Sequence, residues 1–183
     1  MNGTQGGGAS DIAALVASRV VDVPDFPVPG VLFKDISPLF ADPAAFRAVV
    51  DALVAAQASR PFDVVAGIEA RGFVLAAAVA YAAGVGVVPV RKAGKLPRAT
   101  YEATYELEYG QATLEVHRDA FAPGVRVLVI DDVLATGGTA GAALDLIARA
   151  GGEVSSFTVL IELAALGGRG RLNNCPFHSV LTV

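Results

Sequence analysis

The fold is decided by residues 125–139, which read Val-Arg-Val-Leu-Val-Ile-Asp-Asp-Val-Leu-Ala-Thr-Gly-Gly-Thr. The uninterrupted apolar run over residues 127–130 predicts a parallel strand covered on both faces. Two adjacent carboxylates, Asp131 and Asp132, follow this run, and a loop of small residues then leads into a helix. Neighbouring like charges repel, so these two acids need a metal ion, a cation or ligand hydroxyl groups as a partner.

The loop after the paired acids is suited to hold a phosphate. Its residues are small enough for backbone N–H groups to close around an anion, and the start of the next helix adds unsatisfied donors and partial positive charge. The residues predicted to bind the phosphate are Ala135, Thr136, Gly137, Gly138 and Thr139. An ordinary strand-to-helix turn could contain the same glycines, but it would leave Asp131 and Asp132 unexplained. Neither a P-loop pattern nor Gly-x-Gly-x-x-Gly follows the strand.

Helices and strands alternate along the chain. Helices are predicted over residues 11–20, 42–58, 73–83 and 140–150, and strands over residues 63–68, 85–90, 127–130, 154–163 and 177–183. Residues 101–109 and 112–117 alternate apolar and polar side chains on either side of Gly110, as in a two-stranded β-ribbon. This order predicts an α/β fold with a doubly wound, mainly parallel sheet that binds ligands beyond the carboxyl ends of its strands.

Composition limits the class of protein. With 183 residues, the chain is long enough for one domain with a full core. The net charge of −4 and the pI near 5.1 argue against a general nucleic-acid binder, which would present a basic face. The single cysteine, Cys175, permits no internal disulfide and suits a reducing compartment. We therefore expect a cytoplasmic protein.

Two segments could be mistaken for targeting or membrane signals. Residues 1–9 are rich in glycine and polar residues and lack a basic start and an apolar core, so they predict a disordered tail and not a signal peptide. Residues 72–90 are largely apolar and close to the length of a membrane span. Gly84, Gly86 and Pro89 interrupt this stretch, which favours a buried helix followed by a buried strand. No membrane partner is expected.

Two cationic segments lie where such a sheet would bind an anion. Residues 66–73 end a predicted strand and place Arg71 immediately before a helix, where a guanidinium is unfavourable unless an anion is present. Residues 91–98 carry Arg91, Lys92, Lys95 and a fourth cation directly after the next strand. This second segment is either a binding patch for an anionic ligand or a solvated basic loop.

A third segment, residues 26–36, is interrupted by prolines and by Gly30, which predicts an extended, irregular backbone. Its Phe33 could stack on a planar base while the neighbouring main chain reads the edge of that base. Core packing is the ordinary alternative for such a ring.

Together, these segments resemble the adenine phosphoribosyltransferase family, over residues 23–172. The shared motifs are Phe-Pro-x-Pro-Gly-x-x-Phe-Lys-Asp-Ile, Gly-Ile-Glu-Ala-Arg-Gly-Phe, Val-Arg-Lys-x-Gly-Lys-Leu-Pro, Tyr-x-Leu-Glu-Tyr-Gly and the paired-acid loop. In that loop they resemble the phosphoribosyl-pyrophosphate (PRPP) motif of type I phosphoribosyltransferases. The resemblance implies one such domain over residues 10–183, with a hood near residues 21–40 and a lid ribbon near residues 94–117.

The resemblance also implies roles for individual residues. The base would lie against Leu32, Phe33 and Lys34, with Phe33 stacking on it. The pyrophosphate would be bound by Arg71, Arg91, Lys92 and Lys95, and the ribose hydroxyls by Asp131 and Asp132. Catalysis would depend on Arg71 and on Glu108 as acid or base, and the lid would include Tyr105 and Tyr109. A cis peptide bond is expected at Ala70–Arg71, and Glu69-Ala70 replaces an Asp-Ser pair found in some members.

The implied reaction is purine salvage. It transfers the phosphoribosyl group of PRPP to adenine and gives AMP and pyrophosphate, with Mg²⁺ held through PRPP and water and not directly by the protein. A homodimer is expected because family members are usually dimers. Two alternatives remain: a phosphoribosyltransferase for xanthine, guanine or orotate, and a non-catalytic regulator that senses PRPP or purines.

Overall fold

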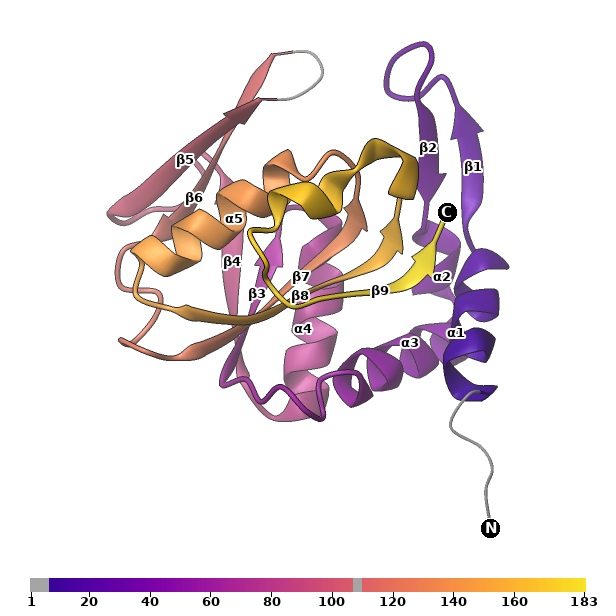
Figure 1. Ribbon diagram of the computed structural model, residues 1–183, viewed down its shortest axis with the longest axis horizontal. Helices are drawn as coiled ribbons and strands as arrows, with labels where there is room; N and C mark the ends of the chain where they lie inside the picture. Colours follow the sequence, from indigo (N-terminus) through magenta and orange to yellow (C-terminus); the bar gives the residue numbers. More distant parts are fainter. Residues whose placement is uncertain (1–6, 107–109) are drawn as a thin grey trace.

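The structure, a computed structural model, describes residues 7–106 and 110–183. Its centre is a seven-stranded sheet with the order β5-β6-β4-β3-β7-β8-β9 (Figure 1). Strands β4, β3, β7, β8 and β9 run parallel, whereas β5 and β6 form an antiparallel ribbon attached to β4. The bounds are β3 (Val64–Ile68), β4 (Gly86–Lys92), β5 (Thr100–Glu106), β6 (Gln111–His117), β7 (Arg126–Leu134), β8 (Glu153–Glu162) and β9 (Phe177–Thr182). The predicted mainly parallel sheet and the ribbon are confirmed.

Helices cover both faces of the sheet. Helix α5 packs on one face, and helices α1, α3 and α4 contribute to the core on the other face (Figure 1). The bounds are α1 (Gly7–Ala17), α2 (Ser37–Ala41), α3 (Pro43–Ala55), α4 (Arg71–Ala83) and α5 (Gly138–Arg149). Asp42 caps α3 by accepting hydrogen bonds from the backbone N–H groups of Ala44 and Ala45, as the Asp-Pro start predicts.

Strand β7 is buried because an apolar layer meets each of its faces. Val127 and Val129 belong to the core beneath α5, whereas Leu128 and Ile130 belong to the core shared with α3 and α4. All four side chains are fully buried. Because successive side chains of a strand point to opposite faces, only a continuous apolar run can fill both layers.

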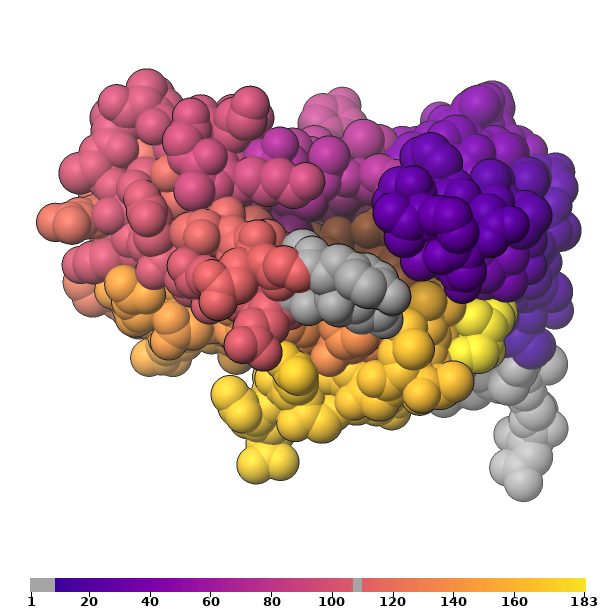
Figure 2. Space-filling model, turned by 90° about the horizontal axis from the view of Figure 1, so that it is seen from above, coloured from indigo at the N-terminus to yellow at the C-terminus, as the bar shows by residue number. Residues whose placement is uncertain are grey.

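The site is framed by parts that are far apart in sequence. The hood, an antiparallel pair of β1 (Val21–Pro24) and β2 (Leu32–Asp35), rises at the edge where the parallel strands end, opposite the β5–β6 ribbon (Figure 1). Seen from above, the ribbon and the hood occupy opposite ends of this face, and the segment after β8 lies along the side between them (Figure 2). That segment contains two short 3₁₀ turns, η1 (Ala164–Leu166) and η2 (Gly168–Arg171).

The N-terminal predictions need correction. Helix α1 begins at Gly7 and ends at Ala17, so residues 7–9 are helical and not a disordered tail, while residues 1–6 lie outside the described part. Val16 is fully buried, and Ile12 and Leu15 pack against the same core. Tertiary packing of this face stabilises the helix. Strand β2, which lies in the segment of residues 26–36 that was expected to be irregular, pairs with β1 across the loop of residues 25–31.

The apolar stretch over residues 72–90 is divided as expected. Helix α4 ends at Ala83, and Gly84 follows in the left-handed conformation with φ of 70°. The expectation of a buried strand after it is wrong in part, because Val90 is fully buried but Val87 is 48% exposed. Among the described helices, none combines the length and apolarity needed to cross a membrane.

Candidate active site

A cavity of about 470 Å³ opens at the carboxyl ends of β7 and β8. Its walls come from the end of β7 and the loop after it, from the hood, and from the segment after β8. The lining residues are Pro27, Val28, Val31, Asp131, Val133, Leu134, Ala135, Thr136, Gly137, Gly138, Thr139, Ala140, Leu163 and Leu166. The structure therefore brings Asp131 and all five predicted phosphate-binding residues to one cavity, beside an apolar wall.

The two adjacent acids lie within β7 and not in the loop after it, because pairing with β8 continues to Leu134. Asp131 and Asp132 are only 9% and 8% exposed. Asp131 Oδ1 accepts a hydrogen bond of 2.8 Å from the backbone N–H of Asp132. Burial, and then the neighbouring charge of Asp132, raise the pKa of Asp131 well above its ordinary value. The pair is thus a charged site that hydroxyl donors or a cation would stabilise.

Arg71, the first residue of α4, is the charge partner of this pair. Its Nη2 lies 2.5 Å from Asp132 Oδ2, although that oxygen receives no hydrogen bond of normal geometry. Its Nη1 donates a hydrogen bond of 3.0 Å to the carbonyl oxygen of Lys34, and its guanidinium lies 4.5 Å from the centre of the Phe33 ring. Arg71 therefore joins the hood to the end of β7.

The turn before α4 differs from the expectation in one bond. The cis peptide bond joins Glu69 and Ala70, and not Ala70 and Arg71, because Arg71 already lies in the helix. Gly72 then allows α4 to begin directly against β7. A Cβ atom at this position would lie 2.9 Å from the carbonyl oxygen of Ile130 and 3.0 Å from Asp131 Oδ1. The close contact fixes the start of α4 beside the paired acids.

The loop of residues 135–139, which is predicted to bind a phosphate and is called the phosphate loop below, is shaped by η2, a segment that sequence reasoning did not identify. Gly137 has φ of 81°, and a Cβ atom there would lie 2.5 Å from the carbonyl oxygen of Gly168. A Cβ atom on Gly168 would in turn collide with the carbonyl oxygen of Ala135. The two backbones are therefore in direct contact, which only glycine permits at these positions.

An ion pair holds η2 in this place. Arg169 donates from Nε and Nη2 to the two carboxylate oxygens of Glu162, and each of these distances is 2.5 Å. The hydroxyl groups of Ser179 and Thr182 also donate to Glu162, and the guanidinium of Arg169 lies 4.8 Å from the ring centre of Phe177. The hydrogen bonds from Arg169 hold the pKa of Glu162 below its ordinary value despite burial. No local sequence signal marks this pair.

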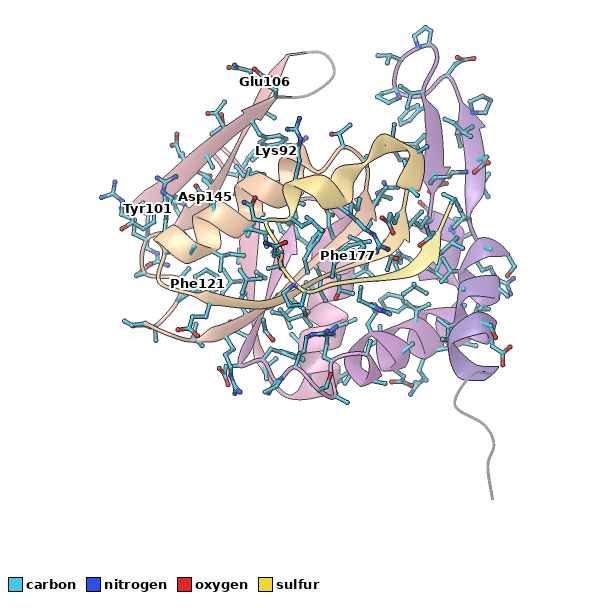
Figure 3. The ribbon with its side chains drawn as sticks, viewed as in Figure 1. Lys92, Tyr101, Glu106, Phe121, Asp145 and Phe177 are labelled. Carbon is cyan, nitrogen blue, oxygen red and sulfur yellow. The ribbon has the colours of Figure 1, made fainter. Side chains whose placement is uncertain are left out.

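Apart from Arg71, the predicted pyrophosphate-binding cations lie at the end of β4, which includes Arg91 and Lys92, and on the loop after it, which includes Lys95. Arg91 donates from Nε to Glu69 (3.2 Å) and from Nη1 to the carbonyl oxygen of Lys95 (3.1 Å). The ammonium groups of Lys92 and Lys95 form no ion pair within the described residues, and both side chains are exposed. Lys92 extends from the end of β4 toward the space between ribbon and hood (Figure 3). These three residues stand near the site but do not line the cavity.

The ribbon lies across α5 and reaches the phosphate loop. Arg149 of α5 donates a 2.7 Å hydrogen bond to the carbonyl oxygen of Glu102 and lies 5.4 Å from the ring centre of Tyr101. A Cβ atom on Gly138 would lie 3.2 Å from the Tyr105 ring. The predicted lid residue Tyr105 is thus at the loop. Tyr109, and Glu108 as the predicted acid or base, lie outside the described residues.

The hood presents residues to the cavity that differ from those predicted to hold a base. Leu32 is 50% exposed, the ring of Phe33 meets Arg71 and the edge of Phe26 at 5.0 Å, and the ammonium of Lys34 pairs with Asp22 at 2.7 Å. None of these three predicted residues lines the cavity. Its apolar wall comes instead from Pro27, Val28 and Val31, together with Leu163 and Leu166 after β8.

Comparison with known proteins places this architecture. The model of the phosphoribosyl transferase domain matches residues 37–176. The adenine phosphoribosyltransferase of Salinispora tropica is 67% identical over 181 residues, which cover 99% of this chain and 96% of that protein. The chain belongs to the adenine phosphoribosyltransferase family.

Solved structures of this family superpose closely. The adenine phosphoribosyltransferase of Thermoanaerobacter pseudethanolicus has a TM-score of 0.91 at 44% identity, over 93% of this chain and 99% of that chain. The Saccharomyces cerevisiae enzyme, solved with adenine and an imino-altritol bisphosphate, has a TM-score of 0.88 at 38% identity, over 93% and 99% of the two chains. The type I phosphoribosyltransferase fold expected from the motifs is therefore confirmed.

The contact between η2 and the phosphate loop predicts a position-specific effect of adding one methyl group. Gly168→Ala should lower the free energy of unfolding by about 1–3 kcal/mol, because the new Cβ atom has no room beside Ala135. Gly170→Ala is the matched control, since nothing lies within 4 Å of its Cβ position and the change should stay within about 0.5 kcal/mol. Urea unfolding measures both, and equal effects would contradict the close packing.

The raised pKa of Asp131 predicts a pH-dependent cost to stability. Between the ordinary carboxyl pKa of 3.8 and the higher folded value, the folded state holds more protons than the unfolded state, so stability falls as pH rises. Asp131→Asn should therefore raise the free energy of unfolding by about 0.5–2 kcal/mol at pH 7. The gain should vanish near pH 4. Urea titrations at both pH values, with exposed Asp51→Asn as control, would disprove this if the two variants behaved alike.

Proposed function

We propose that this chain catalyses the transfer of the 5-phosphoribosyl group from PRPP to adenine, giving AMP and pyrophosphate in purine salvage. The observation that carries the proposal is the cavity itself, in which a phosphate loop, a buried carboxylate and an apolar wall face one another. A sugar phosphate bearing a planar base has this sequence of anionic, hydroxylated and apolar parts. The names of the relatives support adenine as the base.

In this proposal the anionic ends of PRPP are bound by different parts of the chain. The 5′-phosphate lies in the loop of residues 135–139, where backbone N–H groups and the start of α5 favour an anion. Asp131 and Asp132 accept hydrogen bonds from the ribose hydroxyls. Arg71, together with Arg91, Lys92 and Lys95, attracts the pyrophosphate, which leaves when the bond to C1 of the ribose breaks.

Asp131 also fits a magnesium ion that is bound mainly by the substrate. Mg²⁺ prefers substrate phosphates and water with one or two carboxylates, and Asp131 lines the cavity, whereas the buried Oδ2 of Asp132 lies 2.5 Å from Arg71 Nη2. Within the described part of the chain, no group of three or more acidic, His or Cys residues forms a separate metal site. A magnesium ion here would neutralise charge on the leaving pyrophosphate.

The base end of the cavity excludes water and orients the acceptor. Pro27, Val28, Val31 and Leu166 offer apolar surface to a planar purine, and the main chain of residues 32–34 is proposed to read its edge. Phe33 can stack on the base only on ring surface that Arg71 leaves free, because the guanidinium lies over this ring. Glu108 is proposed as the acid or base that handles the proton lost from adenine.

We further propose a cytoplasmic homodimer formed through the outer surface of α4 and β4. Val74, Tyr81 and Val87 are 44%, 90% and 48% exposed there, and Val74 and Tyr81 share one face of the helix because they are seven residues apart. Large apolar side chains gathered on a surface suit a second copy of the chain. The single thiol of Cys175 suits a reducing compartment.

A pyrophosphate-release assay tests the reaction. The protein is mixed with Mg²⁺ and PRPP and given adenine, hypoxanthine, guanine, xanthine or orotate in parallel. Release with adenine alone is expected, because the apolar wall offers nothing to bind the additional oxygens of the other bases. Release with another base would replace adenine in the proposal. PRPP binding without release for any base would indicate a sensor.

The acid–base role of Glu108 gives a separate prediction. Glu108→Gln should lower kcat by about 10²–10⁴-fold, the usual contribution of a general acid or base, while PRPP affinity is retained. Glu106→Gln is the matched control, since this acid on the same ribbon is exposed and the change keeps its backbone carbonyl, which lies beside Gly138. Steady-state kinetics measure kcat, and a binding assay measures the affinity for PRPP. Equal kcat values for the two variants would show that Glu108 is not the acid or base.

A further inference from the structure

A buried carboxylate lies beneath the cationic loop, and the reaction has no direct use for it. Glu115, on β6, is only 3% exposed. Its Oε1 accepts hydrogen bonds of 2.7 Å from the backbone N–H groups of both Lys95 and Leu96. Burial alone would raise the pKa of this carboxyl, but the hydrogen bonds from residues 94–96 outweigh it and keep the pKa below its ordinary value.

The partners of Glu115 are peptide N–H groups together with the Thr100 side chain, and not a cationic side chain. Arg91 faces Glu115 in the register of β4 and β6, yet its guanidinium turns to Glu69 and to the carbonyl oxygen of Lys95. Within the described residues, Glu115 forms no salt bridge. The acid therefore fixes the backbone of the loop without using the charge of Lys92 or Lys95.

Other backbone N–H groups of the loop also donate hydrogen bonds to neighbouring strands and turns. Glu69 accepts from the backbone N–H of Lys92 at 3.0 Å, and the backbone N–H of Ala93 donates to the carbonyl oxygen of Thr113 at 2.9 Å. With Glu115 accepting from the N–H groups of Lys95 and Leu96, hydrogen bonds hold the loop backbone on both sides of Gly94. Gly94, with φ of 80°, makes the turn between these anchors.

We propose that Glu115 is a positioning residue, which holds the loop of residues 92–96 so that its lysines meet the pyrophosphate of the substrate. This inference rests on the proposed function, which assigns those cations to pyrophosphate. Fixing a loop before binding reduces the ordering cost that a flexible lysine loop would impose. The effect of losing Glu115 should thus fall on pyrophosphate and PRPP and not on ligands that lack a pyrophosphate group.

The test compares Glu115→Ala and Glu115→Gln with Glu102→Gln as the matched control. Glu102 pairs with Glu115 in the register of β5 and β6 but is exposed. For Glu115→Ala, we expect about a tenfold or greater rise in KM for PRPP and in Kd for magnesium pyrophosphate, the size of one or two lost hydrogen bonds to a charged group. The Kd for AMP should stay within about twofold, because the phosphate loop and the apolar wall are untouched.

Two further measurements keep the inference open to refutation. The backbone amides of Lys95 and Leu96 should exchange hydrogen at least about tenfold faster in Glu115→Ala. Glu115→Gln retains a carbonyl acceptor, so it should recover part of the pyrophosphate affinity, and it replaces the alanine variant if that variant does not fold. Glu102→Gln should match the wild type throughout.

Several results would overturn the proposal. Unchanged pyrophosphate affinity in folded Glu115→Ala would do so, as would equal losses for AMP and pyrophosphate, because these indicate general destabilisation. Unchanged amide exchange at residues 95 and 96 would also contradict it. A wild type that binds pyrophosphate but forms no AMP from adenine would refute the proposed function only, since the binding and exchange measurements still judge Glu115.

Discussion

The rest of the site depends on the repulsion between two neighbouring carboxylates that follow the four fully buried apolar residues of β7. Asp131 and Asp132 are kept out of water by apolar layers on both faces of β7, and their nearest opposite charge comes from Arg71 on α4. The same guanidinium contacts the ring of Phe33 and the main chain of the hood. One cation therefore links the sheet, a helix start and the small antiparallel sheet, and the cavity lies beside that link.

Around this centre, acids support the loops and leave lysines for ligands. Glu69 and Glu115 hold the loop after β4 through backbone N–H groups, and Glu162 holds η2 through Arg169. The carboxylates of these acids are therefore used to hold loops in place, while the ammonium groups of Lys92 and Lys95 remain exposed to solvent. Glycines then allow the phosphate loop to pack closely against η2 on one side and against the ribbon on the other.

The features that could be predicted from the sequence are those that depend on residues close together in the chain. The apolar run of β7 and the alternation of β5 and β6 were predicted correctly, because burial on two faces and burial on one face each leave a pattern in the local sequence. The small residues of the loop after β7 line the cavity as expected, and their binding of a phosphate stays a prediction. Contacts between residues far apart in the chain leave no such pattern in the local sequence. The pairing of Glu162 with Arg169, the position of Gly168 against Ala135 and the partners of Glu115 depend on the folded chain. The exposure of Val87 was missed because an apolar residue reads the same in a core and on a surface patch.

The raised pKa of Asp131 also ties occupancy of the site to the proton concentration of the solvent. A ligand that requires both carboxylates in their charged form must expel any proton that the buried acid still carries. Over that range of pH, its affinity increases as the solution becomes more alkaline, and the heat measured on binding includes the heat of protonating the buffer. Calorimetry in two buffers of different ionisation enthalpy would then count the protons released. The protonation of Asp131 therefore gives a measure of ligand binding in the cavity.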